Sequence, residues 1–394
     1  MKLKLSDLPD YENCLVNLSN SILKKFDAGT TAKTLSLADP YLEKNYKNVV
    51  VLLLDAMGMS IIEKHLKEDG FFRSHLAGSL DSVYPPTTVA ATTSMLSGLY
   101  PNEHGWLGWD LYFPQLNKNV TVFQNTEQLK EKEGAQPTDA ASDGSKKWTE
   151  DSLEEVRPAA DHNAGFTYLP YKNIIEKIND AGGHAYPVMP FLPPYPQTIE
   201  EILKQIEALC KESEEKFIYA YWNEPDATMH RTGTMSNDTH KMVTELEAMI
   251  EETVSRLPDT LFLITADHSH IDSKNLCLLD YPEITECLLR MPSMEPRTLN
   301  LFVKYEYKES FPEIFRKYFK DAFLLLTREQ VLSNAVFGPG ESREDLEAMI
   351  GDYVALAVSN ESIFNTHMEA QEMPGVHAGL TREEIEIPLI VIEK

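Results

Sequence analysis

Three apolar runs punctuate the chain, and each leads into a group of acidic or histidine residues. They cover 49–55, 216–222 and 261–268, and polar residues bound each run. A continuous run of β-branched, aromatic and leucine residues of this length is typical of a strand buried on both faces. Helical patterns separate the runs, so the order of elements predicts a parallel sheet covered by helices.

Helical segments are recognised by apolar spacing and by their ends. Residues 1–47, 169–183 and 242–257 contain apolar residues at helical spacing. Another helix is predicted to begin at Thr198, because Glu201 follows three residues later in a capping-box arrangement.

Two stretches interrupt this alternation. Residues 113–165 are polar and lack a sustained period, which favours a lid or cap segment over core. Residues 296–345 are richer in charge, and their own helix and strand signals indicate a small α+β cap insert. We therefore expect a three-layer α/β/α sandwich with a mostly parallel central sheet, formed by 1–295 and 346–394.

Composition and charge narrow the functional classes. The 394 residues are 42% hydrophobic and 25% charged, which are ordinary values for a soluble protein with a packed core. The formal net charge of −26 lacks the basic footprint of a protein that binds nucleic acid polymers or anionic membranes. An anionic small molecule remains compatible, because bound divalent cations reverse the local field.

The four cysteines show no CxxC spacing and do not form a disulfide framework; they are Cys14, Cys210, Cys277 and Cys287. The N-terminal residues lack the apolar run of a signal peptide, and no stretch is long enough to span a bilayer. We therefore expect a cytoplasmic protein with no membrane partner. The oligomeric state is not predicted.

Acidic and histidine side chains follow the apolar runs where a parallel sheet gathers its ligands. The carboxyl ends of neighbouring strands lie side by side, so residues distant in sequence can converge there. Asp226 and His230 share one face of a helical turn, and Asp267 and His268 could reach one ion from a loop. Carboxylate oxygen and imidazole nitrogen suit zinc and similar ions. The candidate ligands are Asp55, Asp226, His230, Asp267, His268 and His377.

A hydroxyl-rich stretch, Val83 to Gly105, follows the first run. Thr87 and Thr88 precede a predicted helix, where such residues are common N-caps. A helix N-terminus also favours an anion, and a divalent metal can hold an oxygen nucleophile as an alkoxide. Capping and nucleophilic attack are therefore compatible roles at this position.

Five ordered motifs resemble those of the alkaline phosphatase superfamily, and most closely its type I phosphodiesterase and nucleotide pyrophosphatase branch. They are VVVLLLDAMG, YPPTTVAATTSMLSGLYPNEHG, EPDATMH, TADH and GVHAG. The resemblance runs from about residue 47 to the end and is weaker across 113–215. It implies Thr88 as the nucleophile, ten residues before Gly98. It also implies two metal sites, one formed by Asp55, Thr88, Asp267 and His268, the other by Asp226, His230 and His377.

One position departs from the pattern of this branch. An Asn that helps bind a phosphoryl oxygen usually lies four residues after the Gly of the His-Gly pair, and here that residue is Trp109. The indole could bind substrate by stacking on a base or an apolar leaving group, although packing in the core or lid is favoured.

These features predict a two-metal phosphoric ester hydrolase that prefers a phosphodiester or nucleotide pyrophosphate over a monoester. Thr88 would attack phosphorus and form a phosphothreonine intermediate that water releases. Zn²⁺ is the expected ion, with Mn²⁺ or Fe as alternatives. Phosphonate hydrolysis, phosphomonoester hydrolysis and phosphomutase activity are alternatives on the same site. A non-catalytic metal-binding module with the same fold is the alternative from another class.

Overall fold

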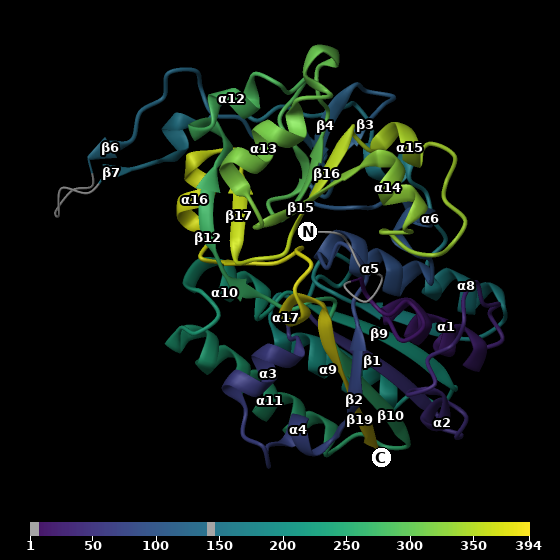
Figure 1. Ribbon diagram of the computed structural model, residues 1–394. Helices are drawn as coiled ribbons and strands as arrows, with labels where there is room; N and C mark the ends of the chain where they lie inside the picture. Colours follow the sequence, from purple (N-terminus) through teal and green to yellow (C-terminus); the bar gives the residue numbers. More distant parts are fainter. Residues whose placement is uncertain (1–7, 140–145) are drawn as a thin grey trace.

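The computed structural model describes residues 8–139 and 146–394 (Figure 1). Its first sheet has six strands in the order β2-β19-β10-β1-β9-β8. The strands are β1 (Asn48–Leu54), β2 (Leu76–Asp81), β8 (Ala185–Val188), β9 (Lys216–Trp222), β10 (Thr260–Thr265) and β19 (Glu386–Glu393). The three predicted apolar runs thus form β1, β9 and β10, and the α/β class is confirmed.

The direction of the strands differs in part from the expectation. β1 pairs in parallel with β9 and β10, and β8 pairs in parallel with β9. β19 runs antiparallel to both β10 and β2, so the sheet is mixed: three of its pairings are parallel and two are antiparallel. The cause is the C-terminal strand, which enters the sheet between two neighbours against their direction.

Helices on two sides of this sheet bury its strands (Figure 1). Every residue of β1 is buried, and each fully buried Val or Leu side chain contributes about 1.5–3 kcal/mol. One group of mutually contacting helices contains α1 (Leu15–Lys25), α5 (Thr88–Ser97) and α8 (Ile174–Asp180). The other surrounds α11 (Asn237–Val254) and contains α3 (Met59–His65), α4 (Phe71–Ser74) and α9 (Ile199–Cys210).

The predicted cap on α9 forms in part. The Thr198 hydroxyl accepts the backbone N–H of Glu201 at 3.3 Å. The Glu201 carboxylate, however, accepts the backbone N–H of Gln197, so the reciprocal half of the capping box is redirected by one residue.

A second sheet of seven strands lies beyond the carboxyl ends of β1, β9 and β10 (Figure 1). Its strands pair antiparallel in the order β15-β16-β14-β13-β3-β4-β5. They are β3 (Asp110–Phe113), β4 (Lys118–Thr121), β5 (Thr126–Glu127), β13 (Ser293–Glu295), β14 (Thr298–Leu301), β15 (Phe323–Thr327) and β16 (Tyr353–Ala357). This sheet takes strands from both sides of the proposed 296–345 insert, and the division into domains stays a prediction.

Short elements complete the chain. Within 113–165, the hairpin of β6 (Thr138–Asp139) and β7 (Lys146–Lys147) projects from the body (Figure 1). The remaining elements are α2 (Asp39–Leu42), α6 (Pro101–His104), α7 (Ala164–Tyr168), α10 (Asp226–Thr232), β11 (Ile271–Asp272), β12 (Lys274–Cys277), α12 (Pro282–Thr285), α13 (Phe311–Phe319), α14 (Arg328–Ser333), α15 (Leu346–Met349), β17 (Glu361–Phe364), α16 (His367–Glu372), β18 (Gly375–Val376) and α17 (Arg382–Ile385), with 3-10 turns at 150–152, 278–280 and 305–307.

A buried ion pair joins the second sheet to the segment that leads into β19. Arg297 lies between β13 and β14, and Glu384 lies in α17; both side chains are fully buried. The guanidinium forms two parallel bonds with the carboxylate, from Nε at 2.7 Å and from Nη2 at 2.8 Å. Its remaining N–H groups reach the carbonyls of Ser359 and Glu361.

The four cysteines are buried and free, as expected. Among the residues described, no helix combines the length and apolar character that crossing a bilayer requires.

Candidate active site

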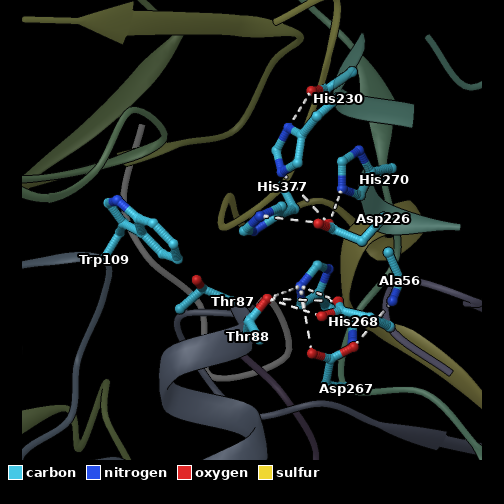
Figure 2. Close-up of polar contacts among 12 residues, drawn as sticks. Ala56, Thr87, Thr88, Trp109, Asp226, His230, Asp267, His268, His270 and His377 are labelled. Atoms are coloured by element: carbon cyan, nitrogen blue, oxygen red, sulfur yellow. Dashed lines mark hydrogen bonds and ion pairs between the residues drawn. The ribbon is translucent and has the colours of Figure 1, made fainter. Parts of the chain in front are cut away.

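The ends of β1 and β10 and the start of α5 bring the first predicted group together (Figure 2). Asp55 follows β1, Asp267 and His268 follow β10, and Thr88 is the first residue of α5. The Thr88 hydroxyl lies 3.2 Å from His268 Nε2 and 3.4 Å from Asp55 Oδ2. His268 Nε2 lies 3.4 Å from Asp55 Oδ1 and 3.6 Å from Asp267 Oδ2.

The second predicted group forms beside the first. Asp226 begins α10 and His230 follows one turn later, so their side chains share a face as expected. His230 Nε2 lies 3.4 Å and His377 Nε2 lies 4.0 Å from Asp226 Oδ1. Figure 2 shows the three side chains around a common space above Thr88 and His268. All seven residues implied as ligands therefore lie in one neighbourhood.

Backbone carbonyls orient three of the imidazoles. His230, His268 and His377 each place Nδ1 against a main-chain oxygen, which holds the ring proton on Nδ1 and leaves the Nε2 lone pair facing the cluster. The acceptors are the carbonyls of Gly375 at 2.9 Å, Ser269 at 3.1 Å and Pro86 at 3.2 Å, respectively.

A fourth imidazole, His270, joins the second group although no motif singled it out. It is fully buried, and its Nε2 lies 2.6 Å from Asp226 Oδ1. The available signal was its position two residues after His268, because alternate residues of an extended segment point to the same side. Its Nδ1 has no hydrogen-bond partner within the described part of the chain, unlike the other three rings.

The two groups have the chemistry of a cation site. Burial, together with the charges of Asp267 and Asp226, raises the pKa of Asp55 well above its usual value, and burial raises the pKa of Asp267. Asp267 Oδ1 accepts the backbone N–H groups of Ala56 and His268, both at 3.0 Å. Its buried Oδ2 accepts no hydrogen bond from the residues described. Such carboxylates gain stability from a bound cation.

The spacing of the donor atoms also fits divalent ions. Two sets of ligand atoms each lie within 4.8 Å of one another. Oxygen and nitrogen donors in these numbers suit zinc and related ions. His230 lies outside the tighter sets, although it is close to Asp226. The sets are Asp55, Asp267 and His268, and Asp226, His268, His270 and His377.

Hydrogen bonding separates the two candidate hydroxyls. Thr87 is the N-cap residue of α5, but its side chain makes no capping bond. Its hydroxyl donates instead to Glu295 Oε1 at 2.6 Å, and the backbone N–H of Trp109 donates to the same oxygen at 2.8 Å. Burial raises the pKa of Glu295 to about 8. The proton of the Thr87 hydroxyl is therefore engaged in the hydrogen bond to Glu295. Of the two threonines, only Thr88 directs its hydroxyl towards the cluster.

A cavity of about 220 Å³ opens beside these groups. Trp109 lines it with a side chain that is 42% exposed and packs edge-on against Phe123. Figure 2 shows the indole across the open space from His377 and Asp226. Trp109 thus lies on the cavity wall and not in the core, whereas its neighbour Trp106 is buried and donates Nε1–H to the Leu169 carbonyl at 2.8 Å. The cavity residues are Thr87, Thr88, Trp109, Asp110, Gln128, Asp226, His230, Pro292, Ser293, Met294, Glu295, Pro296, Leu299, Ile363, Phe364, Asn365, Glu369, Met373, Val376 and His377.

Comparisons with solved structures find this fold in proteins of 15% sequence identity. Murine ectonucleotide pyrophosphatase/phosphodiesterase 5 matches with a TM-score of 0.60 and 15% identity over 86% of this chain and 87% of that one. An inactive variant of the same murine protein, in complex with AMP, matches with a TM-score of 0.59 and 15% identity over 88% and 87%. Phosphonoacetate hydrolase from Sinorhizobium meliloti 1021, in complex with phosphonoformate, matches with a TM-score of 0.56 and 15% identity over 87% and 89%.

Sequence relatives agree with this placement. Venom phosphodiesterase of Macrovipera lebetinus is 27% identical over 158 residues, which is 40% of this chain and 16% of that protein. Human ectonucleotide pyrophosphatase/phosphodiesterase family member 1 is 23% identical over 193 residues, which is 49% of this chain and 18% of that protein. The matched parts span less than a fifth of the length of either relative.

The family model for type I phosphodiesterase/nucleotide pyrophosphatase matches residues 49–336. This match begins at β1 and includes the helix that carries Thr88, the Asp226 group and the Asp267–His268 pair. His377 lies outside the matched residues, and the fold brings it to the same cluster. The protein belongs to the type I phosphodiesterase/nucleotide pyrophosphatase family.

Proposed function

We propose that this protein hydrolyses phosphodiesters with Thr88 as the nucleophile. The observation that carries the proposal is the commitment of Thr87 to Glu295, while the Thr88 hydroxyl faces Asp55 and His268. Family membership supports hydrolysis of a phosphoric ester.

We also propose the three-layer α/β/α arrangement for the part that carries these residues, since helices lie on both sides of the first sheet.

Two divalent metal ions, preferably Zn²⁺, belong to this proposal. Asp55, Thr88, Asp267 and His268 would hold one ion, and Asp226, His230 and His377 the other. When bound, such ions lower the pKa of an oxygen nucleophile and stabilise charge on the phosphoryl and leaving oxygens.

The chain itself orients the reacting hydroxyl. Thr88 begins a ten-residue helix, where unpaired backbone N–H groups and the helix dipole favour an anionic phosphoryl group. Attack forms a bond from Thr88 Oγ1 to phosphorus and breaks the bond from phosphorus to the departing alcohol. Water then breaks the phosphothreonine bond, and the second product leaves with the phosphoryl group.

Charge balance favours a diester over a monoester. With the Thr88 hydroxyl still protonated, the buried carboxylates of Asp55 and Asp267 and the partly buried carboxylate of Asp226 carry three negative charges, so two divalent ions keep one net positive charge for the substrate. A diester carries one negative charge, whereas an ionised monoester carries nearly two. Within the described part of the chain, no Lys or Arg side chain lines the cavity to balance the excess.

The same lining weighs against the alternatives. Phosphonoacetate carries a carboxylate beside the phosphonate, and among the described residues this cavity offers that carboxylate no Lys or Arg; its only imidazoles, His230 and His377, are proposed metal ligands. A non-catalytic binding module would require neither the aligned Thr88 hydroxyl nor the complete set of ligands. Phosphonate hydrolysis and a non-catalytic binding module are therefore less well supported than phosphodiester hydrolysis. Phosphomutase activity is the least supported of these alternatives.

Thr88→Ala, compared with Thr93→Ala on the same helix, tests the proposal on bis(p-nitrophenyl) phosphate. We expect Thr88→Ala to lower kcat at least about 10³-fold, because covalent catalysis is lost, with about two metal ions per chain retained. Thr93, which is buried away from the cavity, should tolerate the change. Mass spectrometry of acid-quenched wild-type reactions should locate the phosphoryl group on Thr88. Wild-type turnover by Thr88→Ala would overturn the proposal.

A further inference from the structure

His367 lies where a projecting arm of the chain meets the body. The arm is the hairpin of β6 and β7 with its flanks; its outgoing half is 129–139 and its return half is 146–157 (Figure 1). His367 begins α16, and its side chain is 20% exposed. The same helix contributes Glu369 to the lining of the cavity. Contacts of the arm with His367 therefore act on a helix that borders the cavity.

Both ring nitrogens of His367 face carboxylates. Nδ1 lies 3.0 Å from each carboxylate oxygen of Glu131, in the outgoing half of the arm, and Nε2 lies 3.1 Å from Asp280 Oδ1. An ionised carboxylate only accepts hydrogen bonds, and a neutral imidazole has a single ring proton. Both contacts are therefore hydrogen bonds only when the ring carries two protons and is an imidazolium ion.

The return half of the arm stacks on the same ring. The Trp148 indole lies parallel to the His367 imidazole, with ring centroids 4.2 Å apart and 8° between the planes. The backbone N–H of Trp148 donates to Gln371 Oε1 at 2.9 Å, one turn further along α16. Tryptophan offers the strongest aromatic face for a cation, so this stack is more stable with an imidazolium ion than with a neutral ring.

The other charged groups of this region have partners of their own. Lys147, in the return half of the arm, lies 3.9 Å from Glu372. Glu369 accepts the Thr366 hydroxyl at 2.7 Å, and burial raises the pKa of Glu369 to about 7. Burial raises the pKa of the Cys277 thiol to about 12, so this group stays neutral. Imidazole groups change charge between about pH 5 and 8, so Glu369 is the neighbour that an experiment must separate from His367.

We propose that His367 is a pH-sensitive latch, which holds the return half of the arm on α16 when its ring carries two protons and releases it when one proton leaves. This inference goes beyond the proposed function and does not depend on it.

The surroundings of the two carboxylates decide which contact is lost. Glu131 is 6% exposed and also accepts the backbone N–H of His367 at 3.0 Å, whereas Asp280 is 64% exposed. A buried carboxylate without a donor costs more than one that turns to water, so the remaining ring proton stays on Nδ1. Asp280 then loses its donor, and Trp148 loses the cation beneath its indole. The outgoing half of the arm stays attached, and the return half detaches more often.

The fluorescence of Trp148 reports the charge of His367, because an imidazolium ion quenches a stacked indole more strongly than a neutral imidazole does. Subtracting the emission of Trp148→Phe from that of wild type isolates this indole from the other three tryptophans. We expect the difference to rise in one step between about pH 5 and 8. The step should be absent when the same subtraction is made in the His367→Gln background. A step that persists there, or no step in wild type, would overturn the inference.

Two further variants separate His367 from its neighbours. Asp280→Asn removes an exposed acceptor of the imidazolium ion and should move the step to lower pH by at least about 0.3 pH unit. Glu369→Gln removes the other group that titrates near neutral pH and should leave the step in place. Loss of the step in Glu369→Gln would assign it to Glu369 and contradict the latch.

Amide hydrogen exchange of a peptide covering 146–150 tests the release itself. Wild type and His367→Gln are compared at the same pH, so that the intrinsic exchange rates cancel. Near pH 5.5 the wild-type peptide should exchange at least about threefold more slowly, and near pH 8.5 the two rates should agree. His162→Gln is the matched control, since His162 also lies beside a carboxylate, that of Asp161 at 2.8 Å, and should match wild type at both pH values. Equal rates for wild type and His367→Gln near pH 5.5 would contradict the latch.

Discussion

His270 donates a hydrogen bond from Nε2 to Asp226 Oδ1 at 2.6 Å, while its buried Nδ1 lacks any partner in the described residues. A neutral imidazole has one ring proton, and a carboxylate can only accept. The proton of His270 therefore lies on Nε2, opposite to its placement in His230, His268 and His377. This geometry makes His270 a positioning residue for Asp226, although its ring also belongs to one of the tighter sets of donor atoms.

His270→Ala should lower the affinity for the ion at the Asp226 group by about 10–100-fold, as expected for loss of a bond that orients a ligand. His270→Gln should recover part of the affinity, because the amide N–H can donate to the same oxygen. Competition with a chelator measures the affinity, and the visible spectrum of the Co²⁺-substituted protein reports the ligand set. A change in that spectrum for His270→Gln would show that the imidazole is itself a ligand.

Removing the metal ions should destabilise the protein and make its stability strongly dependent on pH. A site saturated about 100-fold above its Kd contributes about 3 kcal/mol to the free energy of unfolding. In the metal-free protein, the raised pKa of Asp55 means that the folded state holds a proton that the unfolded state loses above about pH 4. The contribution of Asp55 to stability should therefore fall as pH rises from that value, whereas the lowered pKa values of His270 and His377 act in the opposite direction.

Asp55→Asn provides the matched comparison. The substitution removes one carboxylate from the cluster, so the metal-free variant should have a higher Tm than metal-free wild type at neutral pH. It should also gain less stability from added Zn²⁺. Thermal unfolding with chelator and with zinc measures both effects, and an equal zinc response in the two proteins would show that Asp55 holds no ion.

Glu295→Gln should remove a different pH dependence. The pKa of Glu295 is raised to about 8 from an ordinary value near 4.5, so the folded state binds the proton more tightly than the unfolded state. The contribution is fully present below the ordinary value and is lost as pH rises through about 8. Glutamine mimics the protonated form, so the variant should equal wild type near pH 5 and exceed its Tm near pH 9. If the difference in Tm between Glu295→Gln and wild type were the same at both pH values, the raised pKa of Glu295 would be contradicted.

Breaking the ion pair between Arg297 and Glu384 should be among the most destabilising single changes. Glu384→Gln leaves a fully buried guanidinium without its carboxylate, which costs about 3–5 kcal/mol. Glu383→Gln, the neighbouring exposed residue of α17, is the control and should change stability by less than about 0.5 kcal/mol. Urea unfolding measures both variants.

The ligands at the strand ends could be predicted because parallel strands end at the same edge of a sheet. Residues that follow these strands therefore lie close together, whatever the length or sequence of the connecting segments. Asp55 and Asp267 end neighbouring strands, so their meeting follows from parallel pairing alone. Glu295 carries no such signal. It ends a three-residue strand of the second sheet and meets Thr87 across 208 positions of sequence.

The role of His270 and the direction of β19 could not be predicted from the sequence, for related reasons. His270 is identified by what its two ring nitrogens contact, and its partner Asp226 lies 44 positions away. The apolar pattern of the last strand predicted its burial, but an apolar run has no direction. The antiparallel entry of β19 between β10 and β2 therefore required the structure.

Glu295 also has a mechanical consequence. One of its carboxylate oxygens holds both Thr87, which opens the helix of the nucleophile, and the backbone of Trp109, which leads into β3. β13 and β3 belong to the second sheet, whereas α5 packs with helices beside the first. Any sliding or tilting of the two halves of the molecule is thus transmitted within one residue of the Thr88 hydroxyl. A shift of Glu295 would therefore displace Thr87, which precedes the nucleophile, and Trp109, which lines the substrate cavity, at the same time.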